Sequence, residues 1–130
     1  MARDNSRNGT DRRLVTVAAL LGAVAVTLGA FGAHMLKGRI SAEALGWWHT
    51  AVDYQMWHAI VVLALGLSGL RGVRLPAWLF VTGAVIFSST LYALALGAPR
   101  WLGAVTPLGG LALICGWLVL AWRASRGSLK

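Results

Sequence analysis

Four long apolar stretches most constrain the fold of this chain. They cover residues 14–36, 51–70, 75–98 and 101–122, and Asp53 is the single Asp, Glu, Lys or Arg residue within them. A helix rises ~1.5 Å per residue, so each stretch is long enough to cross a hydrocarbon layer of ~30 Å. With a mean hydropathy of +0.68, the chain has too little polar surface to enclose a soluble core. We therefore predict an all-α integral membrane protein.

The connections between the stretches are short, at residues 37–46, 71–74 and 99–100. Short connections force consecutive helices to be antiparallel neighbours, which predicts an up-and-down four-helix bundle. Ser41 is a good helix N-cap and Glu43 suits the first turn, so the second helix is expected to begin with a short interfacial extension. One transmembrane domain, residues 14–122, would then lie between a polar, disordered cytoplasmic tail (1–13) and a basic cytoplasmic tail (123–130).

Most basic residues lie on one side of this topology. The two tails and the second turn hold nine of the 12 Lys and Arg residues, and Lys37, Arg39 and Arg100 lie on the other side. The positive-inside rule then places both termini in the cytoplasm. Because topology explains the net charge of +8, nucleic-acid binding is not expected. A cleaved signal peptide in residues 1–33 is the competing interpretation, although its apolar run is longer than usual.

Polar side chains within the spans are the candidate functional residues, since a carboxylate in hydrocarbon needs a partner, a wet cavity or a function. If Trp48 marks the outer headgroup level, Asp53 lies ~7 Å deep and His58 lies ~15 Å deep. The same counting places the other polar side chains in the outer half, so we predict one outer-leaflet polar cluster. Its members are His34, His49, Asp53, Tyr54, Gln55, His58, Ser89, Tyr92 and Thr106.

Glycines and a proline mark expected packing positions and a kink. Small residues recur in the first span, and among them Gly22, Gly29 and Gly32 are expected to admit a neighbouring backbone. In the fourth span, Pro107 with Gly109 and Gly110 is expected to kink the helix, because proline removes one helical hydrogen bond.

Several segments across all four spans form a recognisable set. They are Gly29-Ala30-Phe31-Gly32-Ala33-His34, Trp48 with Tyr54-Gln55 and His58-Ala59, Ser89-Thr90-Leu91-Tyr92, and Thr106-Pro107-Leu108-Gly109-Gly110 with Gly116-Trp117. Together these segments resemble a small bacterial inner-membrane family, domain of unknown function 423. The resemblance implies a four-span protein of the bacterial inner membrane and supplies no activity, substrate or cofactor.

These observations favour a non-catalytic structural or accessory membrane component with the bilayer, a second copy or other membrane proteins as partners. The alternative is a small proton-coupled transporter that works as an oligomer, with Asp53 as its titrating group. A metal site is not expected, because His49 and His58 point to opposite sides of one helix and a lone Cys115 excludes a cysteine-based site. No nucleotide is expected without a Gly-rich phosphate loop, and no catalytic residue or cofactor is predicted.

The predicted topology can be tested with a reporter fused after Lys130. With a cytoplasmic carboxyl terminus, a fused green fluorescent protein should fluoresce, because it matures in the cytoplasm. A fused alkaline phosphatase should stay inactive, because it matures only outside the cytoplasm. Fusions after Arg100 should show the opposite pattern. An active phosphatase at Lys130 in intact cells would contradict the topology.

Overall fold

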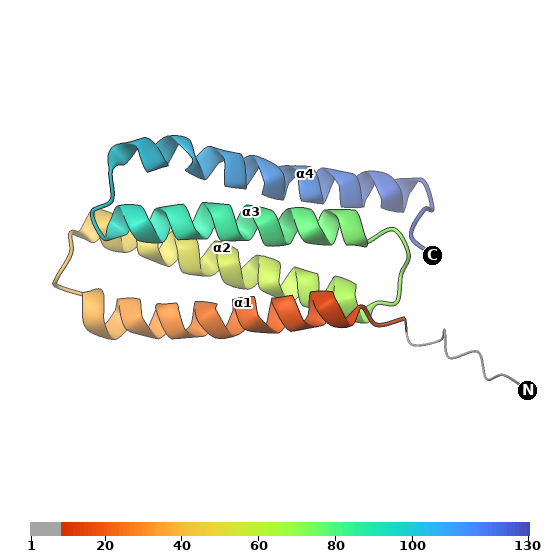
Figure 1. Ribbon diagram of the computed structural model, residues 1–130, viewed down its shortest axis with the longest axis horizontal. Coiled ribbons are helices and arrows are strands. Elements are labelled where there is room, and N and C mark those ends of the chain that lie inside the picture. The colour runs from red at the N-terminus through yellow and green to blue at the C-terminus, as the bar shows by residue number, and fades with distance from the viewer. Residues whose placement is uncertain (1–8) are drawn as a thin grey trace, which may run out of the picture.

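The computed structural model describes residues 9–130 and shows four long helices, each antiparallel to the next (Figure 1). Residues 1–8 of the expected amino-terminal tail lie outside the described residues. All four spans are long and apolar enough to cross a membrane, as predicted. The elements are α1 (Arg12–Phe31) with a π-helical turn (Gly32–Leu36), α2 (Ala42–Leu67), α3 (Arg74–Ala95), a 3₁₀ turn (Arg100–Ala104) and α4 (Thr106–Ser125).

Local capping explains where the first two helices begin and end. Asp11 caps α1 by accepting from the backbone N–H groups of its first turn, so the helix starts two residues before the expected span. The Ser41 hydroxyl accepts from the Ala44 N–H at 3.1 Å, which confirms the predicted N-cap of α2. The helix ends at Leu67, and Gly69 follows with a φ of +68°, a conformation that glycine adopts without strain.

The four helices form an open arc. α1 packs on α2, α2 on α3, and α3 on α4, whereas α1 touches α3 at only a few positions. Among the described residues, α1 and α4 do not pack on each other, and they form the two outer members of the arrangement in Figure 1. The up-and-down order is as predicted, but the bundle is not closed between its first and last helices.

Glycines bring α3 and α4 into close contact. A Cβ on Gly109 would lie 2.5 Å from the Phe87 backbone nitrogen, and a Cβ on Gly116 would lie 2.7 Å from the Phe80 ring. Phe80 is fully buried at this interface, within the main apolar core. These glycines therefore set the distance between the two helices.

Pro107 does not kink a continuous fourth helix, which corrects the sequence expectation. The span begins with the 3₁₀ turn, and α4 starts afresh at Thr106 with Pro107 in its first turn. A proline there costs no helical hydrogen bond, because the first N–H groups of a helix have no partner within it. A Cβ on Gly110 would make only ordinary van der Waals contact with the Phe87 ring, at 3.7 Å.

The expected packing glycines of α1 differ in their surroundings. A Cβ on Gly32 would lie 2.6 Å from the Trp48 ring, and one on Gly29 would lie 3.3 Å from Val52. These two positions therefore admit α2, as predicted. Gly22 has nothing within 4 Å of the same position, so no helix of the described chain packs on it.

Two alanine substitutions should separate packing from helix propensity. Gly109→Ala should lower stability by about 1–3 kcal/mol, because its methyl group would overlap the α3 backbone. Gly22→Ala should leave stability unchanged or raise it by up to about 1 kcal/mol, since alanine favours helix and meets no neighbour there. Thermal unfolding of both variants in one detergent measures the difference. Equal melting temperatures would contradict the glycine-set interface.

Candidate functional site

Gln55 connects three helices at the centre of the arc. Its side chain is only 4% exposed, although it is a polar group in a membrane span. Its Nε2 donates to the Leu21 carbonyl of α1 at 2.9 Å, and its Oε1 accepts from the Tyr92 hydroxyl of α3 at 2.9 Å. One amide therefore uses its donor and acceptor to hold α1 and α3 to α2.

Two further bonds join α2 to its neighbours on either side. The Trp48 indole N–H donates to the Leu28 carbonyl of α1 at 2.8 Å, next to the π-helical turn. The Ser88 hydroxyl of α3 donates to the Ala51 carbonyl at 2.7 Å. Trp48 also packs against Tyr92 of α3, with ring centroids 4.6 Å apart, so its ring contacts both α1 and α3.

His58 joins α2 to α4, two helices whose backbones do not meet. The Trp117 indole N–H donates to His58 Nε2 at 3.2 Å, and His58 Nδ1 lies 2.7 Å from the Tyr54 carbonyl. Since Nε2 accepts, the proton belongs on Nδ1, which donates to that carbonyl, and the imidazole is neutral. Phe80 of α3 packs against both rings, at centroid distances of 5.5 and 4.9 Å.

A pair of threonines links α3 to the start of α4. The hydroxyls of Thr90 and Thr106 lie 2.8 Å apart, and both side chains are buried. One of the two hydroxyls donates to the other. The second then donates its own proton to a carbonyl of its own chain segment, Ile86 for Thr90 or Leu102 for Thr106. The pair thus bridges the helices without leaving a polar atom alone.

We call these eight side chains the bridging network. Within residues 9–130, every buried side-chain nitrogen or oxygen has a hydrogen-bond partner. The network is therefore complete in itself, and its chemistry is that of neutral groups that hold helices together. Its members are Trp48, Gln55, His58, Ser88, Thr90, Tyr92, Thr106 and Trp117.

The structure does not gather the predicted polar cluster into one site. Gln55, His58, Tyr92 and Thr106 belong to the bridging network, and Tyr54 contributes its backbone carbonyl. The other members are exposed on the outside of the helices: His34, His49, Asp53 and Ser89.

Asp53 is the largest departure from the sequence prediction. It was expected to share one polar cluster with His34 and His49, yet the described part of the chain gives it no hydrogen bond or ion pair. That part also contains no group of three or more side chains arranged to hold a metal. Asp53 instead lies on the outer face of α2, on the side that α1 and α3 leave uncovered.

Counting along α3, instead of from Trp48, places Asp53 deeper in the span. Trp48 is 3% exposed and lies inside the bundle. Ala51 is level with Ser88 through their hydrogen bond, and Ser88 lies seven residues, or ~10 Å, before the end of α3 at Ala95. Asp53 is two residues further along α2, at ~13 Å, close to the middle of a ~30 Å hydrocarbon layer.

Sequence reasoning missed Trp48, Ser88, Thr90 and Trp117 as network members. Trp117 could have been identified from the sequence, because it lies 11 residues into α4 and so is too deep for an interfacial belt. Ser88 and Thr90 gave none, since a hydroxyl in a span usually bonds its own helix. Their roles follow only from the register between helices.

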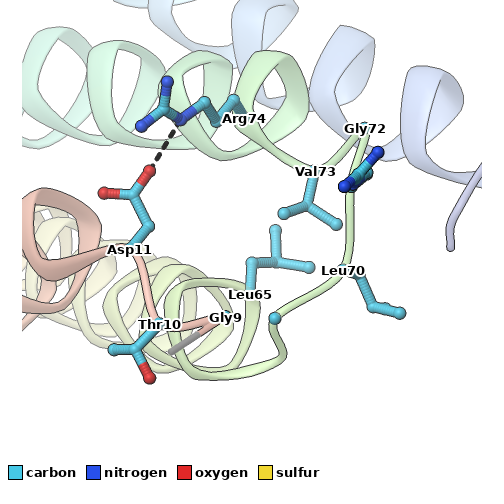
Figure 2. Close-up of a pocket in the computed structure, with 10 residues that line it drawn as sticks. Gly9, Thr10, Asp11, Leu65, Leu70, Gly72, Val73 and Arg74 are labelled. Carbon is cyan, nitrogen blue, oxygen red and sulfur yellow. Dashed lines mark hydrogen bonds and ion pairs between the residues drawn. The ribbon is translucent and has the colours of Figure 1, made fainter. Parts of the chain in front are cut away.

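An ion pair joins the start of α1 to the start of α3, at the end of the bundle that holds the α2–α3 turn. The Arg74 Nε lies 2.7 Å from Asp11 Oδ2, and Figure 2 shows the two side chains pointing toward each other beside a pocket of about 730 Å³. The hydrogen bond from Arg74 lowers the pKa of Asp11 below its usual value, so the carboxylate stays charged. The Asp11 N–H also donates to the Gly66 carbonyl at 2.8 Å, and the Arg71 N–H donates to the Lys130 carbonyl at 2.6 Å. These bonds tie the start of α1 and the carboxyl terminus to the α2–α3 turn.

The fold defines a four-span membrane protein with a polar interior network, and comparison with known proteins places it in a family. Residues 28–110 match the model of the family described as protein of unknown function (DUF423). The chain belongs to this family.

Relatives occur in different bacteria. The chain is 43% identical over 109 residues to the UPF0382 membrane protein SH2409 of Staphylococcus haemolyticus, covering 82% of this chain and 89% of that one. It is 46% identical over 110 residues to the UPF0382 membrane protein YwdK of Bacillus subtilis, covering 78% and 89%. It is 37% identical over 123 residues to the UPF0382 inner membrane protein YgdD of Escherichia coli, covering 90% and 92%. No solved structure matches the chain.

Removing one hydroxyl should test the bridging network. Tyr92→Phe leaves Gln55 Oε1 buried without its donor, so we expect a loss of about 0.5–2 kcal/mol. Ser89→Ala removes an exposed hydroxyl that bonds only its own helix at Ile86, and we expect a change within about 0.5 kcal/mol. Thermal unfolding in detergent compares the two. A Tyr92→Phe protein as stable as Ser89→Ala would show that the network does not stabilise the fold.

Proposed function

We propose that this protein is a non-catalytic assembly component of the membrane, which binds another transmembrane helix on the outer face of α2. The observation that carries the proposal is the position of Asp53, exposed on the outer face of α2 with no partner in residues 9–130. The count along α3 puts it near mid-membrane. A carboxylate at that depth is costly when it faces lipid. A second helix with a polar group opposite would remove this cost.

The interior supports a structural role over a ligand site. The buried polar atoms of the described chain already have partners, so none is left over to recognise a substrate. The bridging network is neutral, and its histidine is held between Trp117 and its own helix. Catalysis needs groups that are poised toward a substrate, and this network points inward at itself.

The outer face of α2 has other features of a docking surface. Gly46, His49, Asp53 and Trp57 recur every three or four residues, so they share one face of the helix, and all are exposed. A Cβ on Gly46 would meet nothing within 4 Å, so the fold of the chain itself does not require a glycine there. Gly46 weakens α2, because glycine disfavours helix. A close partner helix, which glycine often admits in membrane proteins, would explain its presence.

We further propose that both termini lie in the cytoplasm. α1 begins and α4 ends on the same side of the arc, where the Arg71 N–H bonds to the Lys130 carbonyl. Nine of the basic residues belong to that side of the topology, which supports its cytoplasmic placement.

Proton-coupled transport is the second candidate, because an ionisable carboxylate near mid-membrane is also typical of transport pathways. Asp53 faces away from the interior of one copy, so a pathway past it would have to run between subunits. Both candidates therefore need an assembly, but they differ in what the carboxylate does there.

Cysteine cross-linking in native membranes tests the assembly. In a Cys115→Ser background, Thr50→Cys on the outer face of α2 should cross-link to a partner, and Leu111→Cys on the exposed face of α4 should not. Adding Asp53→Ala should lower the cross-linked fraction at least tenfold, whereas Glu43→Gln, an acidic control on the same helix, should have no effect. Cross-linking of the purified chain distinguishes a second copy from another protein. Equal cross-linking with and without Asp53 would overturn the proposal.

Proteoliposomes separate the two candidates. Asp53→Asn keeps a hydrogen-bonding side chain but cannot titrate. If the protein is an assembly component, this variant should still cross-link, and neither the wild type nor the variant should show proton flux. Proton uptake by the wild type, measured with an entrapped pH dye and abolished in Asp53→Asn, would instead establish transport.

A further inference from the structure

A groove runs along the seam between α1 and α3. Three adjoining hollows of about 390, 180 and 220 Å³ share their linings: Val17 borders the first and second, and Leu21, Val24 and Gln55 border the second and third. The groove exists because α1 and α3 both pack on α2 but scarcely on each other. It is therefore a property of the open arc and does not depend on the proposed function.

The groove is charged at one end and apolar along the rest. Its first hollow is bordered by Arg12, Arg13 and Trp78, which belong to the first turns of α1 and α3. Asp11, the acidic residue nearest in sequence, is already paired with Arg74. Beyond Val17 the walls are mainly Leu, Val and Ala side chains, with Gln55 bonded within the network.

The length of the groove fits an acyl chain. From Arg13 to Leu28, the last α1 residue that borders it, the helix rises ~22 Å. One leaflet of a ~30 Å hydrocarbon layer is ~15 Å thick, so a chain that starts at the arginines can lie in the groove for its full length. Trp78 at the same end is suited to the headgroup level, where indole rings prefer to lie.

We infer that this groove is a binding site for one anionic phospholipid. The lipid phosphate binds Arg12 and Arg13 beside Trp78, and one acyl chain lies between α1 and α3 as far as Ser89 and Tyr92. Basic pockets between membrane helices are suited to anionic headgroups, and guanidinium groups bind phosphate oxygens through paired donors. A hollow on the other side of α1, of about 210 Å³ and bordered by Val26, has no charged residue in its lining and is not assigned a lipid.

Lipid retention by the purified full-length chain tests the headgroup contact. Phosphatidylglycerol and phosphatidylcholine with the same acyl chains are offered in detergent, and bound lipid is counted by native mass spectrometry. The wild type should retain one phosphatidylglycerol at least tenfold more than phosphatidylcholine. Arg12→Gln with Arg13→Gln should reduce this preference to below twofold, whereas Lys37→Gln with Arg39→Gln, which removes two charges at the other end, should preserve it. Glycerol phosphate, which lacks acyl chains, should not displace the lipid.

Filling the groove tests the acyl contact separately. Val24→Trp should lower retention of phosphatidylglycerol at least tenfold with both arginines present, and Val26→Trp on the other side of α1 should not. Circular dichroism checks that each variant is folded. Leu20 also borders the groove, so Leu20→Trp is used if Val24→Trp does not fold. Equal retention of the two lipids by the wild type would overturn the inference. So would unchanged retention in the arginine or the groove-filling variants.

Discussion

The hydrocarbon layer cannot hydrogen-bond a polar group, and this constraint explains the interior of the protein. Gln55 shows its effect most clearly, because both ends of its amide are used, toward Leu21 and Tyr92. His58 follows the same rule, with one nitrogen donating to Tyr54 and the other accepting from Trp117. In a membrane, apolar packing gives little preference for one helix neighbour over another, so such pairs specify which helices meet and in what register.

Glycines make those pairings possible. The Trp48 indole reaches the Leu28 carbonyl because Gly32 presents no side chain where the tryptophan ring lies. Gly109 plays the corresponding part between α4 and α3, beside the Phe87 backbone. Close approach and polar bridging thus occur together, since a short side-chain bond requires backbones that are near each other.

Sequence reasoning predicted the elements well because hydropathy and capping are local properties. The four spans and the Ser41 cap needed no knowledge of neighbours. The depth and direction of Asp53 could not be found in this way, because both depend on how α2 is rotated and shifted against α1 and α3. Burial of Trp48 could not be found either, since a tryptophan near a span end usually faces the headgroups, and here Gly32 makes room for its ring inside the bundle.

The order of contacts has a consequence for biosynthesis. Helices that are adjacent in the chain pack on each other, and α4 makes no packing contact with α1 among the described residues. A nascent chain can therefore complete most native contacts of each hairpin as soon as its second helix leaves the ribosome and enters the bilayer. The contacts among the first three helices need not await the carboxyl terminus. The packing of α4 on α3, the Trp117–His58 bond and the backbone bond at Lys130 form last.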